Sequence, residues 1–140
     1  MVSPQTALIY TMVLVSAADG AMTDPELQAI GEIVRTLPVF KDYDTANVTR
    51  AAEDCAAMLA ADEGFEAAVG VIAGSLPAKL RETAYALACD IAAADLRADQ
   101  EELRLLEILR HRLAIDRLTA AAIERGARAR HAIYAPGEDA

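Results

Sequence analysis

The sequence predicts an all-α protein, a single compact bundle of about seven helices built from two related helix-turn-helix units. Hydrophobic residues make up 54% of the 140 residues but aromatic residues only 4%, and the many alanines favour close-packed helices. Apolar positions recur at helical spacing between short turns. An acidic turn at residues 18–27 returns at residues 94–103 with a constant offset, since 95 − 19 and 102 − 26 both give 76.

The first helix is predicted to begin at Ser3 and Pro4, with serine as the cap and proline at the first helical position. Residues 7–18 are apolar over most of the helix circumference, which places this helix in the middle of the bundle. Asp19 and Gly20 are expected to end it, because glycine adopts the left-handed conformation of a helix C-terminus most easily.

The second helix is predicted to begin with a capping box. Thr23 would cap the helix, and Glu26 stands three residues further on, at the spacing this motif requires. An apolar stripe runs from Leu27 to Leu37, and Pro38 closes the helix. Because only a few residues join the two helices, they must be close neighbours.

The other helices follow from the same signals. Asp44 or Thr45 is the expected cap of the third helix, and Asp116 begins the last. We expect one helical domain over residues 1–133 and a frayed tail over residues 134–140. The predicted helices lie at residues 44–61, 65–75, 77–94, 99–113 and 116–129.

The charge of the chain is unevenly distributed. The net charge is −9; residues 1–96 contain 5 Lys and Arg and 14 Asp and Glu, whereas residues 97–140 contain 8 of each. An acidic surface repels a phosphate backbone, so nucleic acid is not the expected partner. Arg125, Arg128 and Arg130 are interleaved with acids and favour a solvated face; the weaker alternative is docking to an acidic partner or a membrane surface.

Other features point to a cytoplasmic protein. Cys55 and Cys89 stand among alanines and form no C-x-x-C motif, as is typical of small buried hydrophobes in a reducing compartment. The N-terminus lacks the basic region of a signal peptide. The longest apolar run, residues 7–18, falls short of the ~20 residues needed to span a bilayer, so no transmembrane segment is expected.

No catalytic constellation can be assembled from the sequence. His111 and His131 have no carboxylate or cysteine at ligand spacing, and both are expected at the surface. Neither a G-x-S-x-G nor a nucleotide-binding glycine motif occurs. We therefore predict a protein that is not an enzyme, with no catalytic residues and no organic cofactor.

Helix capping alone does not explain three of the aspartates. Asp19 and Asp95 each follow an apolar helix at its C-terminal end, where a negative charge is unfavourable. Asp90 is the only charged residue between Thr83 and Ala94, and a carboxylate on such a helix usually needs a partner.

If the two turns meet, their carboxylates could hold a divalent cation. An all-oxygen site suits Ca²⁺, Mg²⁺ or Mn²⁺, although the turn is too short for an EF-hand loop. The alternative is that the acids only cap helices, where the exposed N–H groups and the helix dipole favour them. The predicted ligands are Asp19, Glu26, Asp95 and Glu102, with Asp24, Asp90 and Asp99 as a second ring.

The repeated turn resembles the TerB family of tellurite-resistance proteins. Residues 17–26 read Ala-Ala-Asp-Gly-Ala-Met-Thr-Asp-Pro-Glu, similar to the family's A-x-A-D-G followed by an acidic helix start. Residues 93–103 carry the second copy, in which Leu96 replaces the glycine and Arg97 adds a positive charge. The likeness extends over roughly residues 5–130.

This resemblance implies a compact all-helical module of the bacterial response to tellurite and related stresses. It further implies an acidic surface that binds divalent cations or a protein partner. The family works with calcium-binding and membrane-embedded Ter proteins, so we expect stress-response partners and contact with the inner face of the membrane only through them. A homodimer is left open. The alternative function is a purely structural interaction or assembly module without a metal site.

Overall fold

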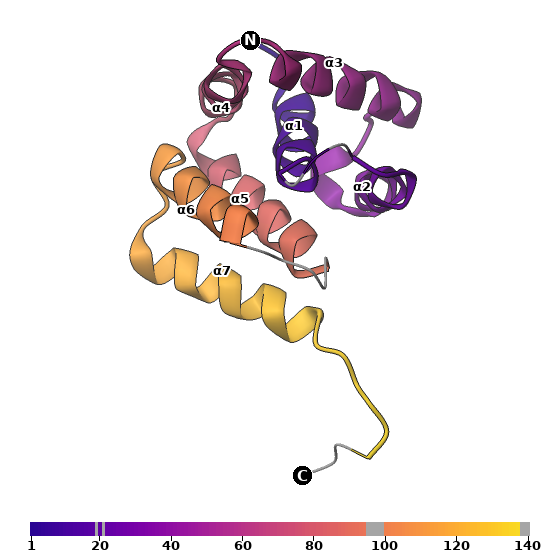
Figure 1. The fold of residues 1–140 in the computed structure, drawn as a ribbon, viewed down its shortest axis with the longest axis vertical. Helices are drawn as coiled ribbons and strands as arrows, with labels where there is room; N and C mark the ends of the chain where they lie inside the picture. Colours follow the sequence, from indigo (N-terminus) through magenta and orange to yellow (C-terminus); the bar gives the residue numbers. More distant parts are fainter. Residues whose placement is uncertain (19, 21, 95–99, 138–140) are drawn as a thin grey trace.

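The computed structural model describes residues 1–18, 20, 22–94 and 100–137. Within these residues the chain forms seven α-helices and two short 3₁₀ helices and no β-strand, which confirms the predicted all-α bundle (Figure 1). The α-helices are α1 (Pro4–Ser16), α2 (Asp24–Thr36), α3 (Val48–Ala60), α4 (Gly64–Ser75), α5 (Ala78–Ala94), α6 (Gln100–Arg112) and α7 (Arg117–Arg130).

Helix α1 forms the centre of the bundle, as its apolar circumference predicts. Every residue from Ala7 to Ser16 is buried, and α1 packs against α3, α4 and α5 (Figure 1). The predicted cap is also present, because the Ser3 side chain accepts a hydrogen bond from the backbone N–H of Thr6. A helix without a polar face is stable in water only when other helices surround it.

The two-unit repeat predicted from the turns extends to the second helix of each unit, whereas the first helices, α1 and α5, differ in length, at 13 and 17 residues. Helix α2 runs from Asp24 to Thr36 and α6 from Gln100 to Arg112; 100 − 24 and 112 − 36 both give 76, the offset of the acidic turns. The helices that precede them, α1 and α5, pack against each other more extensively than any other pair of described helices. The core therefore forms where the first helices of the two units meet.

The start of the third helix differs from the prediction. The Asp44 side chain accepts a hydrogen bond from the backbone N–H of Ala46, but the turn that it caps is the 3₁₀ helix Thr45–Asn47. The α-helix begins only at Val48. A cap satisfies N–H groups of either helix type, so the capping residue could be predicted but the helix type could not.

Helix α4 begins where two backbones come very close. Glu63 has a left-handed φ of 55°, and a Cβ atom on Gly64 would lie 2.0 Å from the carbonyl oxygen of Met58. Any larger residue at position 64 would force α3 and α4 apart, so the sharp turn between them depends on this glycine.

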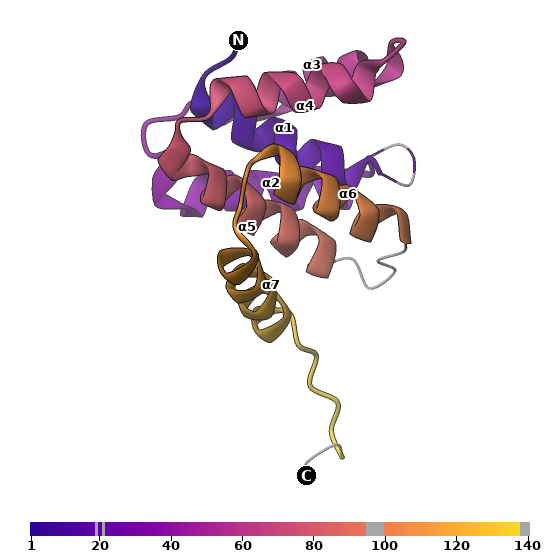
Figure 2. The ribbon, with the colours of Figure 1, turned by 90° about the vertical axis from the view of Figure 1, so that its left-hand side faces the viewer.

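Helix α7 is attached mainly to α5. Asp116 is its cap, as predicted, and accepts a hydrogen bond from the backbone N–H of Thr119 at 2.9 Å. The Thr119 hydroxyl also donates to this carboxylate, at 2.8 Å. The two hydrogen bonds stabilise the ionised form of Asp116 and lower its pKa. Figures 1 and 2 show α7 outside the other helices, with the residues after it leading away from the bundle.

Among the described residues, no helix combines the length and the apolar character needed to cross a membrane.

We predict that stability depends strongly on the buried face of α1. Met12 is fully buried, so Met12→Ala should lower the free energy of unfolding by about 2–5 kcal/mol through lost burial and a residual cavity. Urea denaturation followed by far-UV circular dichroism measures it. Exposed Lys79→Ala is the control and should change the value by no more than about 0.5 kcal/mol; equal effects of the two variants would contradict the central role of α1.

Candidate functional site: the first acidic turn and its pocket

The first acidic turn joins α1 to α2 through a complete capping box. Glu26 Oε1 accepts hydrogen bonds from the backbone N–H of Thr23 at 2.8 Å and from its hydroxyl at 2.9 Å. In return, the Glu26 N–H donates to Thr23 Oγ1 at 3.3 Å. The predicted capping box is therefore confirmed, and one carboxylate oxygen of Glu26 serves the local turn.

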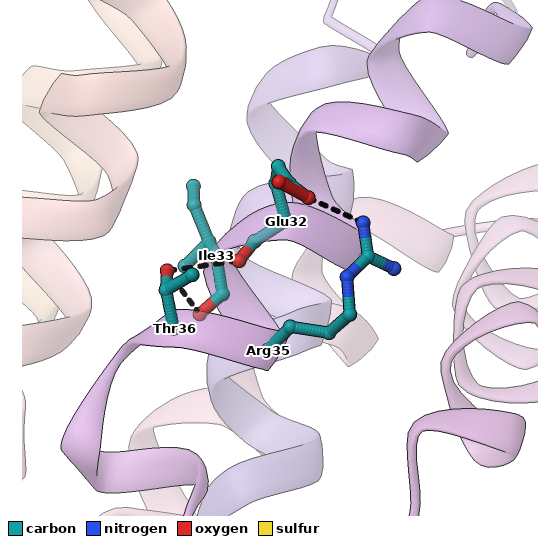
Figure 3. A network of polar contacts seen from close by, with 4 residues as sticks. All are labelled: Glu32, Ile33, Arg35 and Thr36. Carbon is teal, nitrogen blue, oxygen red and sulfur yellow. Dashed lines mark hydrogen bonds and ion pairs between the residues drawn. The ribbon is translucent and has the colours of Figure 1, made fainter.

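The opposite end of α2 is stabilised in a different way. The Thr36 hydroxyl donates to the carbonyl oxygens of Glu32 and Ile33 within the same helix, and Arg35 forms an ion pair with Glu32 (Figure 3). These contacts are local and exposed. They lie within α2 and do not position residues outside it, whereas the capping box positions Thr23, the residue before the helix.

The predicted metal ligands fall into three groups. Asp19, Asp95 and Asp99 lie outside the residues that the structure describes, so their meeting in space stays a prediction. Asp24 is exposed in the first turn of α2. Glu102, in α6, is only 2% exposed. Within the described part of the chain, no three Asp, Glu, His or Cys side chains come together as a metal-binding group.

Asp90 has the partner that its position on an apolar helix predicts. Its carboxylate lies 2.6 Å from Arg130 Nη2 and 3.4 Å from His131 Nε2, both at the end of α7. The Asp90 side chain is 23% exposed, so this contact is partly shielded from water. His131, expected at the surface, has a side chain that is 31% exposed and lies beside a carboxylate 41 positions away, since 131 − 90 gives 41.

An open, mostly apolar pocket of about 830 Å³ lies beside the first acidic turn. We call it the turn pocket. Its walls come from the end of α1, the turn, the start of α2, and helices α3, α4 and α6. Side chains lining it include Val13, Leu14, Met22, Leu27, Ala52, Glu53, Ala56, Leu59, Phe65, Arg104, Leu105 and Ile108.

The chain segments around the turn pocket are acidic in sequence. The segments that contribute to it, residues 22–27, 49–65 and 104–108, contain seven Asp and Glu but only two Lys and Arg. Glu53 and Arg104 are the charged residues of the described lining, and both are exposed. The pocket therefore combines an apolar interior with a surrounding of net negative charge.

Sequence reasoning missed the turn pocket because it has no local motif. Its walls come from five helices and a turn that are far apart along the chain. The apolar residue of the turn, Met22, gave no signal either, because an apolar residue directly before a helix cap is the usual position of a hydrophobic staple, here with Leu27 four positions into the helix.

A second, smaller groove of about 480 Å³ lies over α5, between α6 and α7. Tyr85 and Cys89 form part of its floor. The Tyr85 hydroxyl donates to Glu124 Oε2 at 2.6 Å, and burial together with this contact raises the pKa of Tyr85. Tyr85 thereby joins α7 to α5 inside the groove.

The two cysteines are buried, as predicted. Burial raises the pKa of the Cys55 thiol to about 12 and that of the Cys89 thiol to about 12 as well. At neutral pH both thiols therefore remain protonated, and a protonated thiol is a poor nucleophile and metal ligand.

We compared the sequence of the chain with models of known protein families. The family model described as "Tellurite resistance protein TerB" matches residues 5–125. The chain belongs to the TerB family. This match confirms the resemblance carried by the repeated turn, and it spans both helix-turn-helix units and the start of α7. Comparison with curated proteins and with solved structures gave no match.

We predict that the capping box of this TerB domain holds the first turn in place. Thr23→Ala removes both of its side-chain hydrogen bonds with Glu26 and should cost about 1 kcal/mol of the free energy of unfolding. Thermal and urea denaturation measure it. Thr36→Ala, at the other end of α2, is the matched control and should cost clearly less, because its hydroxyl bonds only to carbonyls of its own helix; a larger loss for Thr36→Ala would refute the prediction.

Proposed function

We propose that this chain is a non-enzymatic TerB-type stress-response module that binds a basic protein partner at its first acidic turn. The observation that carries the proposal is the turn pocket, an open apolar hollow whose surrounding segments are acidic. A partner of this kind would be a segment with apolar side chains on one face and Lys or Arg around them. It would act in the cytoplasm, and contact with the inner face of the membrane would come through such a partner.

The dimensions of the turn pocket support this proposal. A volume of about 830 Å³ is of the size that binding sites for organic ligands and peptide anchors have. Its apolar lining includes Leu59 and Phe65, which are only half-buried. Covering such side chains with a partner removes apolar surface from water, which is the main favourable term in association.

The charges support the choice of a basic partner. An acidic surface raises the association rate of a basic segment and repels acidic competitors. An enzymatic function has no comparable support. Burial raises the pKa of both cysteine thiols, which makes them poor nucleophiles, and the sequence offers no catalytic motif.

We predict that the turn pocket discriminates between peptides by charge. Two synthetic amphipathic peptides with the same apolar face are compared, one with a Lys and Arg polar face and the other with Glu and Asp. The basic peptide should bind, with an affinity that falls as salt screens the charges, and the acidic peptide should not. Fluorescence anisotropy measures both; equal binding of the two peptides would refute charge selection.

A matched pair of variants on α3 locates the binding. Ala56 lines the turn pocket and is exposed, whereas its neighbour Ala57 is exposed but does not line it. Ala56→Arg should abolish binding of the basic peptide by filling the mouth with a bulky positive charge. Ala57→Arg adds the same charge outside the pocket and should leave most of the binding intact.

The second candidate function is binding of a divalent cation between the two turns. The observation that favours it is the burial of oxygen-bearing side chains at the helix ends that adjoin the turns: the Glu102 carboxylate and the Ser16 hydroxyl are each 2% exposed. With Asp19, Glu26 and Asp95 they would provide the oxygen ligands that Ca²⁺, Mg²⁺ or Mn²⁺ prefers, with Asp24 and Asp99 beyond. Asp90 is paired with Arg130 and His131, which makes it the least suitable of the predicted ligands.

We predict that cation binding depends on Glu102. Calorimetric titration with each of the three ions should give heat and a rise in thermal stability, because a ligand that binds only the folded state stabilises it. Glu102→Gln should lose both effects, as should the pair Asp19→Ala and Asp95→Ala. Glu107→Gln, at an exposed site on the same helix, is the control. No heat at millimolar metal would remove this candidate.

The remaining alternative is an assembly module in which the acidic turns only cap helices. It shares the pocket with the first proposal but requires no charge selection and no cation. The two titrations therefore distinguish it, since the basic and acidic peptides would then bind equally and no cation would bind, while the capping role of Thr23 and Glu26 persists.

A further inference from the structure

The C-terminal part of this chain has the chemistry that the turn pocket would select. Residues 117–134 contain four arginines and one glutamate, in contrast to the acidic segments around the pocket. Two apolar side chains follow directly, Ile133 at 65% and Tyr134 at 69% exposed. A basic helix end followed by exposed apolar residues is the type of segment that an acidic apolar pocket accommodates.

In the structure this segment does not occupy the pocket of its own chain. No residue of 125–134 lines the turn pocket, and Figures 1 and 2 both show the end of α7 and the following residues on the far side of the bundle from α3, which forms one wall of the pocket. The ion pair of Arg130 with Asp90 and the contact of His131 with the same carboxylate hold the segment there. The side chains of Ile133 and Tyr134 beyond His131 are largely exposed, so another molecule can reach them.

We propose that the C-terminal segment of one copy, residues 125–134, binds in the turn pocket of a second copy. This inference rests on the proposed function of the turn pocket and names its partner. Arg125 and Arg128 would lie over the acidic segments around the pocket, and Ile133 and Tyr134 would enter the apolar interior. The two contacting surfaces differ, so the interface is heterologous and either closes by reciprocal exchange or continues from copy to copy.

Sedimentation velocity of the full chain tests this inference. We expect association that grows with protein concentration at low ionic strength and weakens by about tenfold when salt screens the charges. Ala56→Arg should abolish it by blocking the pocket, and Ala57→Arg should not. Ile133→Asp should abolish it by removing the apolar anchor, whereas Ala132→Asp adds the same charge at an exposed neighbouring position and should retain most of it.

Mixing the two defective variants gives the sharpest result. The Ala56→Arg copy keeps an intact C-terminal segment, and the Ile133→Asp copy keeps an intact pocket. Each should be monomeric alone, and the mixture should recover one contact and form a one-to-one complex. Failure of the mixture to associate, or association of either variant alone at the level of the unmodified chain, would overturn the inference.

The result also separates this inference from the proposed function. A full chain that stays monomeric at all concentrations, while the basic synthetic peptide still binds in the turn pocket, would reject the second copy as partner and leave the pocket's function standing. A chain that neither associates nor binds the basic peptide would reject both. Circular dichroism of each variant, matched to the unmodified chain, establishes that the substitutions leave the fold intact.

Discussion

The contact between α1 and α5 is the constraint on which the rest of the structure depends. Helix α1 has no polar face, and all residues from Ala7 to Ser16 are buried. It must therefore be surrounded, and α5, the first helix of the second unit, covers it more extensively than any other described helix. Once this pair is in place, α2 and α6 follow their partners after only a few residues, and α3 and α4 close the remaining side.

This arrangement explains why the first acidic turn lies at the edge of the core. It follows α1, so it begins where the buried part of that helix ends. In the first turn, Glu26 is held by Thr23, and the half-buried apolar side chains of Met22 and Leu27 lie next to this rigid cap. A hydrogen-bonded helix cap next to apolar surface gives a pocket wall that needs little ordering when a ligand binds, which lowers the entropic cost of binding.

Local features of the fold could be predicted from the sequence, but features made by distant segments could not. The caps at Ser3, Thr23 and Asp116 are correct because the capping residue and its target N–H group are at most three residues apart. The partner of Asp90 could be expected but not identified, because Arg130 and His131 meet it only through the packing of α7 on α5. The turn pocket was not predicted because its lining comes from many segments. Asp19, Asp95 and Asp99 lie outside the described residues, and their convergence stays a prediction.

The way α7 is attached also has a consequence for the dynamics of the molecule. Its buried residues are two alanines, Ala120 and Ala127, and its described polar links to α5 are those of Tyr85 with Glu124 and of Asp90 with Arg130 and His131. Burying alanine side chains contributes little free energy, so α7 can detach while the central pair of helices stays folded. Its backbone amides should therefore exchange with solvent through a partial opening of low free energy, whereas those of α1 exchange only when the whole domain unfolds.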